Sequence, residues 1–538
     1  MDYMQFALYL LTIAAAFLTM EVYSLELKRD LMMFQQNSYR YSRYRRWLSQ
    51  SADSTSGFRM CGYALFLLAL AKFSLIKEWP AMVLYVVFSI VYILGCRRRV
   101  YKKPLVWTRR ATRIYVVASI LPLAVAACLM VVFKENGFFS VAVAYMGFYI
   151  GSHLMVMFSN LLLTPVERHI TGKYYKDAKR RLESMPDLKI IGITGSYGKT
   201  STKHYLERIV SEKYQVTMTP GSFNTTLGVV RTVREHLKPY DEVFIVEMGA
   251  KNLGDIKEIC DLVHPQIGII TAVGEQHLES FKTIENVQST KFELADALPA
   301  DGLAILNDDF PYVASRAVDN APVVRYAVDN VSDPDAAYKA CDIEFTRKGT
   351  KFVVHGPEGY RLNLETRLLG SCNISNLLGA VIAARAIGIE DDRIVRAVAA
   401  IEPVEHRLSR KTTAGGVTII DDAFNSNPAG SSMALDVLSM MTPGKRIIIT
   451  PGMIELGDRE YELNREFGRK IARCADVAIV VGQYNREAIL EGIHQEGTMK
   501  DDCIHAVDTF AKAQEVIGGI CRTGDTVLYE NDLPDTFK

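Results

Sequence analysis

The residues with the clearest chemical meaning lie in the stretch Ile190–Thr202, which reads IIGITGSYGKTST. An apolar run typical of a β-strand leads into a glycine-rich turn, which a lysine, a threonine and a helix-like segment follow. Backbone N–H groups of such a turn can converge on phosphate oxygens, and the N-terminus of the next helix adds a positive dipole. Lys199 would neutralise the β- and γ-phosphates, and the hydroxyl of Thr200 would ligate Mg²⁺. The pattern therefore favours a nucleoside triphosphate site over a structural glycine turn.

This loop departs from the general G-x-x-x-x-G-K-[ST] pattern, because the first glycine of that pattern would fall at Ile193. The form present here is T-G-x-x-G-K-T. The predicted ATP contacts of the loop are Thr194, Gly195, Ser196, Tyr197, Gly198, Lys199, Thr200 and Ser201.

One further side chain could complete a metal site, although it has a plain alternative. Glu247 closes the apolar run VFIV, and a carboxylate at the C-terminal edge of such a strand faces the ligand crevice of an α/β sheet. Its oxygens suit Mg²⁺, but a surface glutamate at a strand end has the same pattern. Taken alone, His277 is typical of an ordinary loop histidine, and Lys291 of a surface lysine on a helix.

The T-G-x-x-G-K-T form is the one found in the Mur ligases, and further segments of the chain resemble that family in order. VEMGAKNLGDI (Val246–Ile256), AVGEQHLESF (Ala272–Phe281) and STKFEL (Ser289–Leu294) are similar to segments of the branch that adds D-alanyl-D-alanine, the MurF type. SCNISNLLGAVIAARAIGI, HRL, IIDDAFNSNPAG and IELGDREYELNREFG follow in family order. The resemblance leaves the first third of the chain outside it.

The resemblance implies an ATP-dependent amide ligase, which converts a carboxylate into an acyl phosphate and joins it to an amino acid or dipeptide. A carboxylate does not react with an amine at neutral pH, so activation needs an in-line γ-phosphate with its charge neutralised. The implied cofactors are ATP and two Mg²⁺ ions, with Thr200, Glu247, His277 and Lys291 as metal ligands. Lys291 would act after carbamylation by CO₂, which requires a neutral amine and hence a lowered pKa. The implied catalytic residues are Lys199, Lys291 and His277.

The family also implies contacts to the nucleotide from outside the loop. Asn373 and Asn376 would meet the base and ribose, and Arg407 and Asp422 would meet phosphate and ribose when two domains close around the site. For Asn373, capping of a helix is the alternative.

Some features depart from the MurF pattern. Cys372 stands where the family usually has His, Phe424 where this branch usually has Tyr, and Asn464 where it usually has His. The sequence ends YENDLPDTFK, without the K-G-S of that branch. These changes leave the nucleotide chemistry in place and put the incoming amino acid in doubt. MurF-type ligases also hold the UDP-sugar end of their precursor with a separate domain, for which this chain offers no candidate, so the acceptor is expected to be lipid-linked or handed over by a membrane-bound partner.

The first third of the chain has the composition of a membrane domain. The 538 residues have a net charge of +1, but residues up to Leu163 include 18 basic and 7 acidic side chains, whereas the rest include 44 basic and 54 acidic ones. The alternative is a set of buried core helices. Helices of this length in soluble proteins carry a polar stripe, however, and the apolar stretches here lack one. Five stretches approach the length of a membrane-spanning helix: Tyr3–Met20, Met60–Ile76, Ala81–Cys96, Ile114–Phe133 and Phe138–Leu163.

The loops between these stretches predict an orientation. Basic residues gather in segments 28–46 and 97–113, so the positive-inside rule places both in the cytoplasm, with the N-terminus outside and everything after Thr164 in the cytoplasm. The first stretch does not fit a signal peptide, because its short leader holds Asp2 and no Lys or Arg.

From Leu188 onward, short apolar runs alternate with amphipathic helices, which predicts α/β domains with largely parallel sheets. The predicted organisation is an N-terminal all-α membrane domain of about five transmembrane helices (residues 1–163), an amphipathic linker (164–187), a P-loop Mur ligase central domain (188–402) and a Rossmann-like C-terminal domain (403–538).

Other classes of function have less support. The acidic second part argues against nucleic-acid binding, and the nine scattered cysteines lack metal-ligand spacing. An ATP-coupled transporter would need a signature such as L-S-G-G-Q, which the sequence lacks. A nucleotide-sensing membrane scaffold with a dead active site would have lost Lys199, Glu247 or Lys291, and all three are present. Among ligases, capsule or poly-glutamate synthesis is the main rival to peptidoglycan synthesis. The expected partners are a cell-wall precursor, lipid-linked or soluble, an amino acid or dipeptide, and the bilayer of a bacterial cell membrane.

Overall fold

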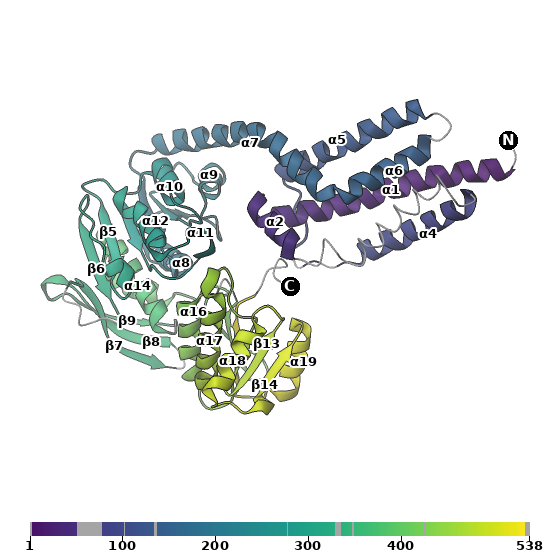
Figure 1. Cartoon of the computed structure of the whole chain (residues 1–538). Coiled ribbons are helices and arrows are strands. Elements are labelled where there is room, and N and C mark those ends of the chain that lie inside the picture. Colours follow the sequence, from purple (N-terminus) through teal and green to yellow (C-terminus); the bar gives the residue numbers. More distant parts are fainter. Residues whose placement is uncertain are drawn as a thin grey trace. The chain divides into compact units, whose positions relative to one another are not determined.

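The chain forms two compact units, one built on residues up to Thr171 and one running from Gly172 to Asp532 (Figure 1). The computed structural model describes residues 3–50, 78–99, 101, 103–133, 137–276, 278–328, 335–346, 349–423 and 426–532.

The first unit is a bundle of helices around one long central helix. Helix α1 (Tyr3–Gln36) packs against α4 (Glu78–Arg97), α5 (Arg109–Val132) and α6 (Gly137–Ile150), and α2 (Tyr41–Gln50) follows it in the chain. α7 (Ser152–Glu183) then leaves the bundle. α5 turns small side chains such as Ala111, Ala118 and Ala126 inward, which lets helices approach closely.

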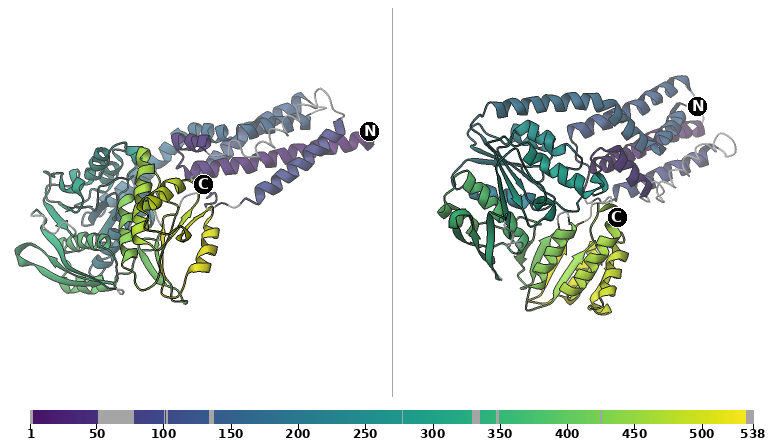
Figure 2. Two further views of the ribbon diagram at one scale, coloured as in Figure 1. Left: turned by 60° about the horizontal axis from the view of Figure 1, so that its bottom comes forward. Right: turned by 60° about the vertical axis from the view of Figure 1, so that its left-hand side comes forward.

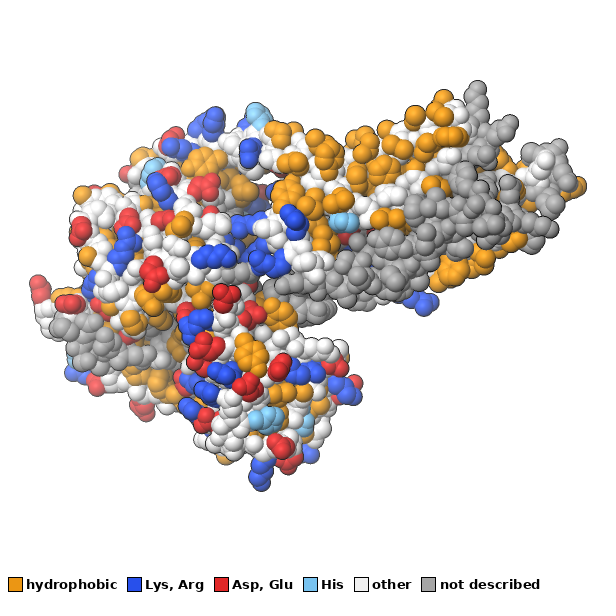
Figure 3. All heavy atoms as spheres, in the orientation of Figure 1, with side chains coloured by type: hydrophobic (Ala, Val, Ile, Leu, Met, Phe, Trp, Pro, Cys, Tyr) orange, Lys and Arg blue, Asp and Glu red, His pale blue; other side chains and the backbone are white. Residues whose placement is uncertain are grey.

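The surface of this unit is unusually apolar. Large hydrophobic side chains lie exposed along α1, α4, α5 and the first part of α7, and Figure 3 shows orange patches over this unit, in contrast to the mixed charges of the second unit. Acidic side chains lie inside it instead: Glu26 is 1% exposed and accepts a 2.6 Å hydrogen bond from the Tyr92 hydroxyl, and the buried Asp30 accepts one from Ser152. Apolar outside and polar inside is the arrangement that a bilayer favours. Exposed examples are Val91, Leu94, Ile120, Leu123, Val131 and Leu161.

The helices match the predicted spans in part. Among the described residues, two helices are long and apolar enough to cross a membrane, Gln5–Gln36 within α1 and α5, and Met82–Arg97 is a shorter apolar helix. The predicted span Met60–Ile76 lies outside the described residues. The predicted span Phe138–Leu163 falls on two helices, because α6 and α7 meet at Gly151 with a bend of 77°, which makes this stretch a broken span or a re-entrant pair.

The second unit begins on α7. From Gly172 onward this helix packs on the rest of the second unit through the buried Ala178 and through Tyr174 and Leu182. Arg234, on α9 (Thr226–Glu235), pairs with Asp177 at 2.7 Å, and its guanidinium lies 4.1 Å from the centre of the Tyr174 ring. Residues 172–187 of the predicted linker therefore lie in the fold of the second unit.

A nine-stranded sheet organises the first half of this unit, with the strand order β2-β3-β1-β4-β5-β6-β7-β8-β9. The first seven strands in this order, from β2 through β1 to β7, are parallel to one another. β8 and β9 add an antiparallel edge. The strands are β1 (Lys189–Thr194), β2 (Val216–Met218), β3 (Val243–Glu247), β4 (Ile267–Ile270), β5 (Leu303–Asn307), β6 (Val323–Ala327), β7 (Tyr338–Thr346), β8 (Gly349–His355) and β9 (Arg361–Thr366).

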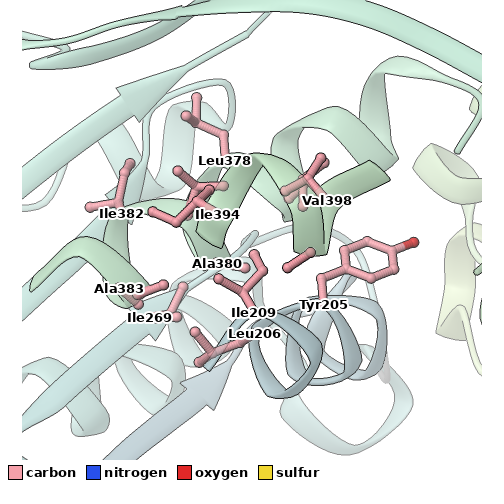
Figure 4. Close-up of a cluster of buried hydrophobic side chains, with 14 of the residues drawn as sticks. Tyr205, Leu206, Ile209, Ile269, Leu378, Ala380, Ile382, Ala383, Ile394 and Val398 are labelled. Atoms are coloured by element: carbon pink, nitrogen blue, oxygen red, sulfur yellow. The ribbon is translucent and has the colours of Figure 1, made fainter. Parts of the chain in front are cut away.

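Helices cover both faces of this sheet, because its central strands are apolar on both sides. One face carries α8 (Lys199–Val210), α14 (Ser371–Ala386) and α15 (Asp391–Ala399), whose side chains interlock in the cluster of Figure 4. The other face carries α9, α10 (Asp255–Val263) and α12 (Ile284–Asp296). Two short helices, α11 (Leu278–Phe281) and α13 (Pro311–Ala314), lie in its loops. The predicted α/β fold is confirmed.

A second, six-stranded sheet forms the C-terminal half, in the order β10-β11-β15-β12-β13-β14, with only β10 antiparallel to its neighbour. α16 (Pro428–Ser439), α17 (Glu460–Cys474) and α18 (Arg486–Glu496) cover one face, and α19 (Phe510–Ile520) packs on the other (Figure 2). This is the predicted Rossmann-like arrangement. Its strands are β10 (Ser409–Thr412), β11 (Thr418–Asp422), β12 (Arg446–Thr450), β13 (Val477–Val481), β14 (Ile504–Val507) and β15 (Thr526–Glu530).

Candidate active site

The phosphate loop connects β1 to α8 at the carboxyl edge of the sheet. Gly195 has φ +152° and Gly198 has φ +80°, which are backbone conformations that favour glycine. Space forbids a side chain as well: a Cβ at Gly195 would lie 2.1 Å from Thr271 Oγ1, and one at Gly198 would lie 2.0 Å from Asn376 Oδ1. The two glycines therefore let the loop turn tightly against its neighbours.

Side chains of the loop fix it to the ends of β3 and β4. Thr194 Oγ1 donates to the Met248 carbonyl at 2.8 Å, and Ser196 Oγ donates to the Gly274 carbonyl at 3.1 Å. The Tyr197 hydroxyl donates to the Glu275 carbonyl at 3.3 Å. Thr200 is half-buried in the first turn of α8, and Ser201 is buried beside it. The predicted loop residues thus lie together, and several of them shape the loop rather than face a ligand.

Lys199 folds back over its own loop. Its Nζ donates to the carbonyl oxygens of Gly195 at 2.6 Å and Ser196 at 3.2 Å. Burial lowers the pKa of Lys199 to about 8, partly offset by the negative charge of Glu247. Carbonyl oxygens thus hold the ammonium directly over the place where the sequence predicts phosphate.

Glu247 lies at the end of β3, directly beside Ile193 of β1 in the parallel register. Its Oε1 accepts a 3.0 Å hydrogen bond from Asn224 Nδ2, and its Oε2 lies 2.9 Å from Lys203 Nζ. Burial alone would raise its pKa, but the charges of Lys203 and Lys199 outweigh burial and lower the pKa of Glu247. The interpretation as an exposed surface glutamate is wrong, because only 1% of the side chain is exposed.

Lys291 lies on α12 and is 2% exposed, so it is not a surface lysine. Burial, and then the positive charge of Lys199, lower the pKa of Lys291 well below its usual value. His277 lies outside the described residues.

The two predicted asparagines on α14 have different surroundings. Asn373 is held by two protein contacts, because its Oδ1 accepts from the Tyr205 hydroxyl at 2.8 Å and its Nδ2 donates to the Leu369 carbonyl at 2.9 Å. It does not cap the helix, since Gly370 is the N-cap residue. Asn376 lies against the phosphate loop, with its amide oxygen over the Cα of Gly198.

Arg407 and Asp422 lie near each other in the C-terminal half of the unit. Asp422, which is half-buried, ends β11 next to the fully buried Glu530, the last residue of β15. Burial raises the pKa of both, and the charge of Asp422 raises that of Glu530 further. Burial lowers the pKa of Arg407, while the charges of Asp422 and Glu247 oppose this shift.

Sequence reasoning did not predict Lys203, Asn224 or Glu530 as parts of this region. Lys203 follows Lys199 by four residues, which places both on one face of α8, and this spacing was the available signal. Glu530 stands in the segment that lacks K-G-S. Asn224 lies in a loop with no feature that distinguishes it in the sequence.

The residues that depart from the MurF pattern fall in different surroundings. Asn464 is fully buried on α17, where its amide accepts from Met453 N at 2.8 Å and donates to the Met453 carbonyl at 3.0 Å. It therefore shapes the loop before that helix. Cys372 is half-buried at the start of α14, and Phe424 lies outside the described residues.

Models of two known domains match the chain, the Mur ligase middle domain over residues 193–384 and the Mur ligase glutamate ligase domain over residues 406–529. A relative from Mycobacterium tuberculosis is 33% identical over 363 residues, which is 63% of this chain and 70% of the relative. The chain belongs to the Mur ligase family. That relative is named UDP-N-acetylmuramoyl-tripeptide–D-alanyl-D-alanine ligase.

Solved structures of Mur ligases share the fold. MurF from Acinetobacter baumannii aligns with a TM-score of 0.60 and 26% identity, covering 67% of this chain and 77% of that protein. MurF from Thermotoga maritima, solved with ADP, aligns with a TM-score of 0.59 and 23% identity, over 67% of this chain and 80% of that one. The chain is thus a Mur ligase of the MurF type, an ATP-dependent enzyme that forms ADP.

Proposed function

We propose that this Mur ligase is anchored in the membrane and joins a cell-wall precursor carboxylate to an amino acid or dipeptide. The observation that carries the proposal is the group formed by Lys199, Glu247 and Lys291, in which the charge of Lys199 acts on both of the other side chains. The ammonium of Lys199 is suited to attract an anionic phosphate and to hold it next to the buried carboxylate of Glu247 and the buried amine of Lys291, which are the proposed metal ligands.

The chemistry proposed for these residues is the activation of a carboxylate by ATP. The acceptor carboxylate oxygen attacks the γ-phosphorus, ADP leaves, and an acyl phosphate results; the incoming amine then displaces phosphate and loses a proton. We infer that Lys199 leaves the loop carbonyls to meet the β- and γ-phosphates. Arg407 would stabilise the charge on the transferred group, and exclusion of water would protect the acyl phosphate from hydrolysis.

The residues present fit Mg²⁺. Glu247 offers a buried carboxylate whose Oε1 accepts a hydrogen bond from Asn224 and whose Oε2 lies 2.9 Å from the ammonium of Lys203, and Thr200 offers a hydroxyl in the first turn of α8; both side chains supply the oxygen donors that Mg²⁺ prefers. The proposed ligands are Thr200, Glu247, His277 and carbamylated Lys291. Mg²⁺ bound there would neutralise phosphate charge.

Carbamylation of Lys291 fits its surroundings. The neutral amine adds CO₂ and releases one proton, which yields an anionic carbamate. A buried lysine with a strongly lowered pKa supplies that neutral amine near pH 7, and the carbamate would also balance the charge of Lys199.

The remaining proposed contacts concern the nucleotide. Asn376, which already touches the loop at Gly198, and Asn373 would approach the base and ribose, and Asp422 would approach the ribose. Asn373 would have to exchange a contact to Tyr205 or Leu369 for the nucleotide.

Membrane anchoring is supported by the exposed apolar surface of the helical unit and by the two helices long enough to span a bilayer. We propose that the catalytic unit faces the cytoplasm, where ATP is available, and that the N-terminus lies outside. The basic loops predicted from the sequence support this orientation.

We further propose that the preferred acceptor is linked to a membrane lipid, or delivered by a membrane-bound partner. The two Mur domain models match residues 193–384 and 406–529 and leave the helical unit outside. Tethering enzyme and acceptor to one membrane raises their effective concentration and could replace binding energy from contacts to a soluble carrier. The added group is proposed to be a dipeptide or amino acid, as in the name of the relative, with glutamate addition to a polymer as the rival.

The test uses the purified full-length protein in detergent or nanodiscs with ATP and Mg²⁺. Matched peptide acceptors, one linked to a polyprenyl lipid and one to UDP, are compared by kcat/KM and by product mass. A higher value for the lipid-linked form is expected. Equal or better use of the UDP-linked form, with an activity that does not fall when the membrane spans are deleted, contradicts the lipid-linked acceptor. Absence of any amide product contradicts the ligase itself.

A further inference from the structure

A fully buried lysine lies beside Glu247 and has no role in the chemistry described above. Lys203 is on α8, one turn after Lys199, and its side chain is 0% exposed. Its Nζ lies 2.9 Å from Glu247 Oε2 and donates a 2.7 Å hydrogen bond to the Gly221 carbonyl oxygen. A buried ammonium is costly unless it is paired in this way.

The Gly221 carbonyl belongs to loop 219–225, which encloses Glu247. Asn224 Nδ2 donates to Glu247 Oε1 at 3.0 Å, and the backbone N of Glu247 donates to Thr219 Oγ1 at 3.0 Å. The loop also lies close to the residues that follow Glu247, because a Cβ at Gly249 would be 2.7 Å from Asn224 Cγ. Lys203 therefore joins α8, this loop and the end of β3 at one carboxylate.

We propose that Lys203 is a positioning residue for the metal site, which holds the Glu247 carboxylate in place before metal binds and competes with the metal for it. The inference rests on the proposed role of Glu247 as a Mg²⁺ ligand. A fixed cation in contact with a metal ligand opposes metal binding by charge repulsion. In return it keeps the buried carboxylate paired and in one geometry, which catalysis requires.

This role predicts two effects in opposite directions when the charge is removed. Metal affinity should rise, because the competing cation is lost, while kcat should fall, because Glu247 and loop 219–225 lose a fixed contact. If Lys203 were purely structural, its replacement would lower both stability and metal affinity. A rise in metal affinity together with a fall in kcat therefore distinguishes the positioning role from a structural one.

The experiment uses full-length Lys203→Gln and Lys203→Met proteins in detergent, with Mn²⁺ as the probe. Free Mn²⁺ is measured by electron paramagnetic resonance, with and without a non-hydrolysable ATP analogue. Both variants should bind Mn²⁺ roughly tenfold more tightly than the native protein. kcat should fall further for Met than for Gln, since the Gln amide can still donate to Gly221.

Lys213→Gln is the matched control. Lys213 also donates to a glycine carbonyl, Gly388 at 2.6 Å, and pairs with a glutamate, Glu390 at 2.9 Å, but it lies beyond the end of α8. Mn²⁺ affinity and kcat of this variant should equal those of the native protein.

Unchanged or weaker Mn²⁺ binding in Lys203→Gln overturns the inference. A Lys203 variant that folds only when Mn²⁺ is present supports it, because the metal then replaces the missing cation, and one that fails to fold even with Mn²⁺ overturns it. Glu247→Gln separates the two proposals: if it leaves Mn²⁺ binding unchanged, the metal role of Glu247 is wrong. If it weakens binding while Lys203→Gln does not tighten it, only the role of Lys203 is wrong.

Discussion

At the scale of single residues, the site is defined by a few buried charges that would be unstable alone. Glu247 is paired with Lys203, and Lys199 is held by two carbonyl oxygens of its own loop. Both arrangements pair the charge in the absence of phosphate and metal. The residues proposed to carry the chemistry are thus held in place by contacts within the protein.

Lys199→Ala should abolish amide formation. The change removes the charge that would meet the γ-phosphate, and contacts of this kind stabilise a transition state by about 3–4 kcal/mol, which corresponds to a loss of at least a hundredfold in kcat/KM. Product formation is measured by mass, and folding is checked by unfolding temperature. Turnover within tenfold of the native protein would contradict this role.

Lys291→Ala should be nearly as severe if the carbamate is a metal ligand. Millimolar short-chain carboxylates should partly restore turnover by occupying the place of the carbamate, and a protein prepared without CO₂ should show the same loss. Native turnover in Lys291→Ala without added carboxylate would rule out the modified lysine.

The lowered pKa of Lys199 makes nucleotide binding pH-dependent. With a pKa of about 8, the ammonium is protonated below that pH and becomes neutral above it, so the affinity of the free enzyme for phosphate is present at pH 7 and falls as pH rises through about 8. The measurement is the dissociation constant of an ATP analogue between pH 6.5 and about 9.5. A constant affinity over this range would show that Lys199 keeps its charge.

At the scale of elements, the phosphate loop depends on contacts between segments far apart in the sequence. The parallel register places Glu247 beside the strand that enters the loop, and α14 places Asn376 over Gly198.

Gly198→Ala should weaken ATP binding more than it weakens folding. The φ of +80° costs alanine about 1 kcal/mol, and the new Cβ would in addition collide with Asn376 Oδ1, 2.0 Å away. Gly254→Ala is the matched control, because Gly254 has φ +86° with open space around it. It should lose similar stability and keep its affinity for ATP. Equal affinities in the two variants would contradict a role for this close contact.

The sequence was sufficient for some of these elements and not for others. The strand, glycine turn and helix at Ile190–Thr202 are local, so periodicity and turn chemistry predict them directly. The pairing of Lys203 with Glu247 joins a helix to a strand some forty residues away, and no local pattern reports it. Asn373 was assigned by resemblance alone, and the Tyr205 hydroxyl that holds it comes from another helix. The bend at Gly151 was missed, because a long apolar run hides a break that carries no charge.

At the scale of the whole molecule, the chain joins an apolar helical unit to a Mur ligase. The helical unit exposes large apolar side chains and buries acidic ones, whereas the catalytic unit has the usual mixed surface. The proposed membrane location therefore determines which acceptors the enzyme can reach.

Topology can be tested with reporters. A reporter fused after Leu163 should report the cytoplasm, and one in loop 134–137 should report the exterior, because the basic segments 28–46 and 97–113 stay inside. A fusion in segment 28–46 serves as an internal control and should also report the cytoplasm. The reverse pattern would separate the catalytic unit from its ATP and contradict the proposed orientation.

The most direct test of the account follows one oxygen atom. The acceptor is prepared with ¹⁸O in its free carboxylate and incubated with full-length protein, ATP, Mg²⁺ and the amine, and the released phosphate is analysed by mass. Attack of the carboxylate on the γ-phosphorus, followed by displacement of phosphate by the amine, predicts one ¹⁸O in each phosphate and one phosphate for each amide. Phosphate without ¹⁸O would mean that water, and not the acceptor, attacks ATP, and would contradict a ligase that works through an acyl phosphate.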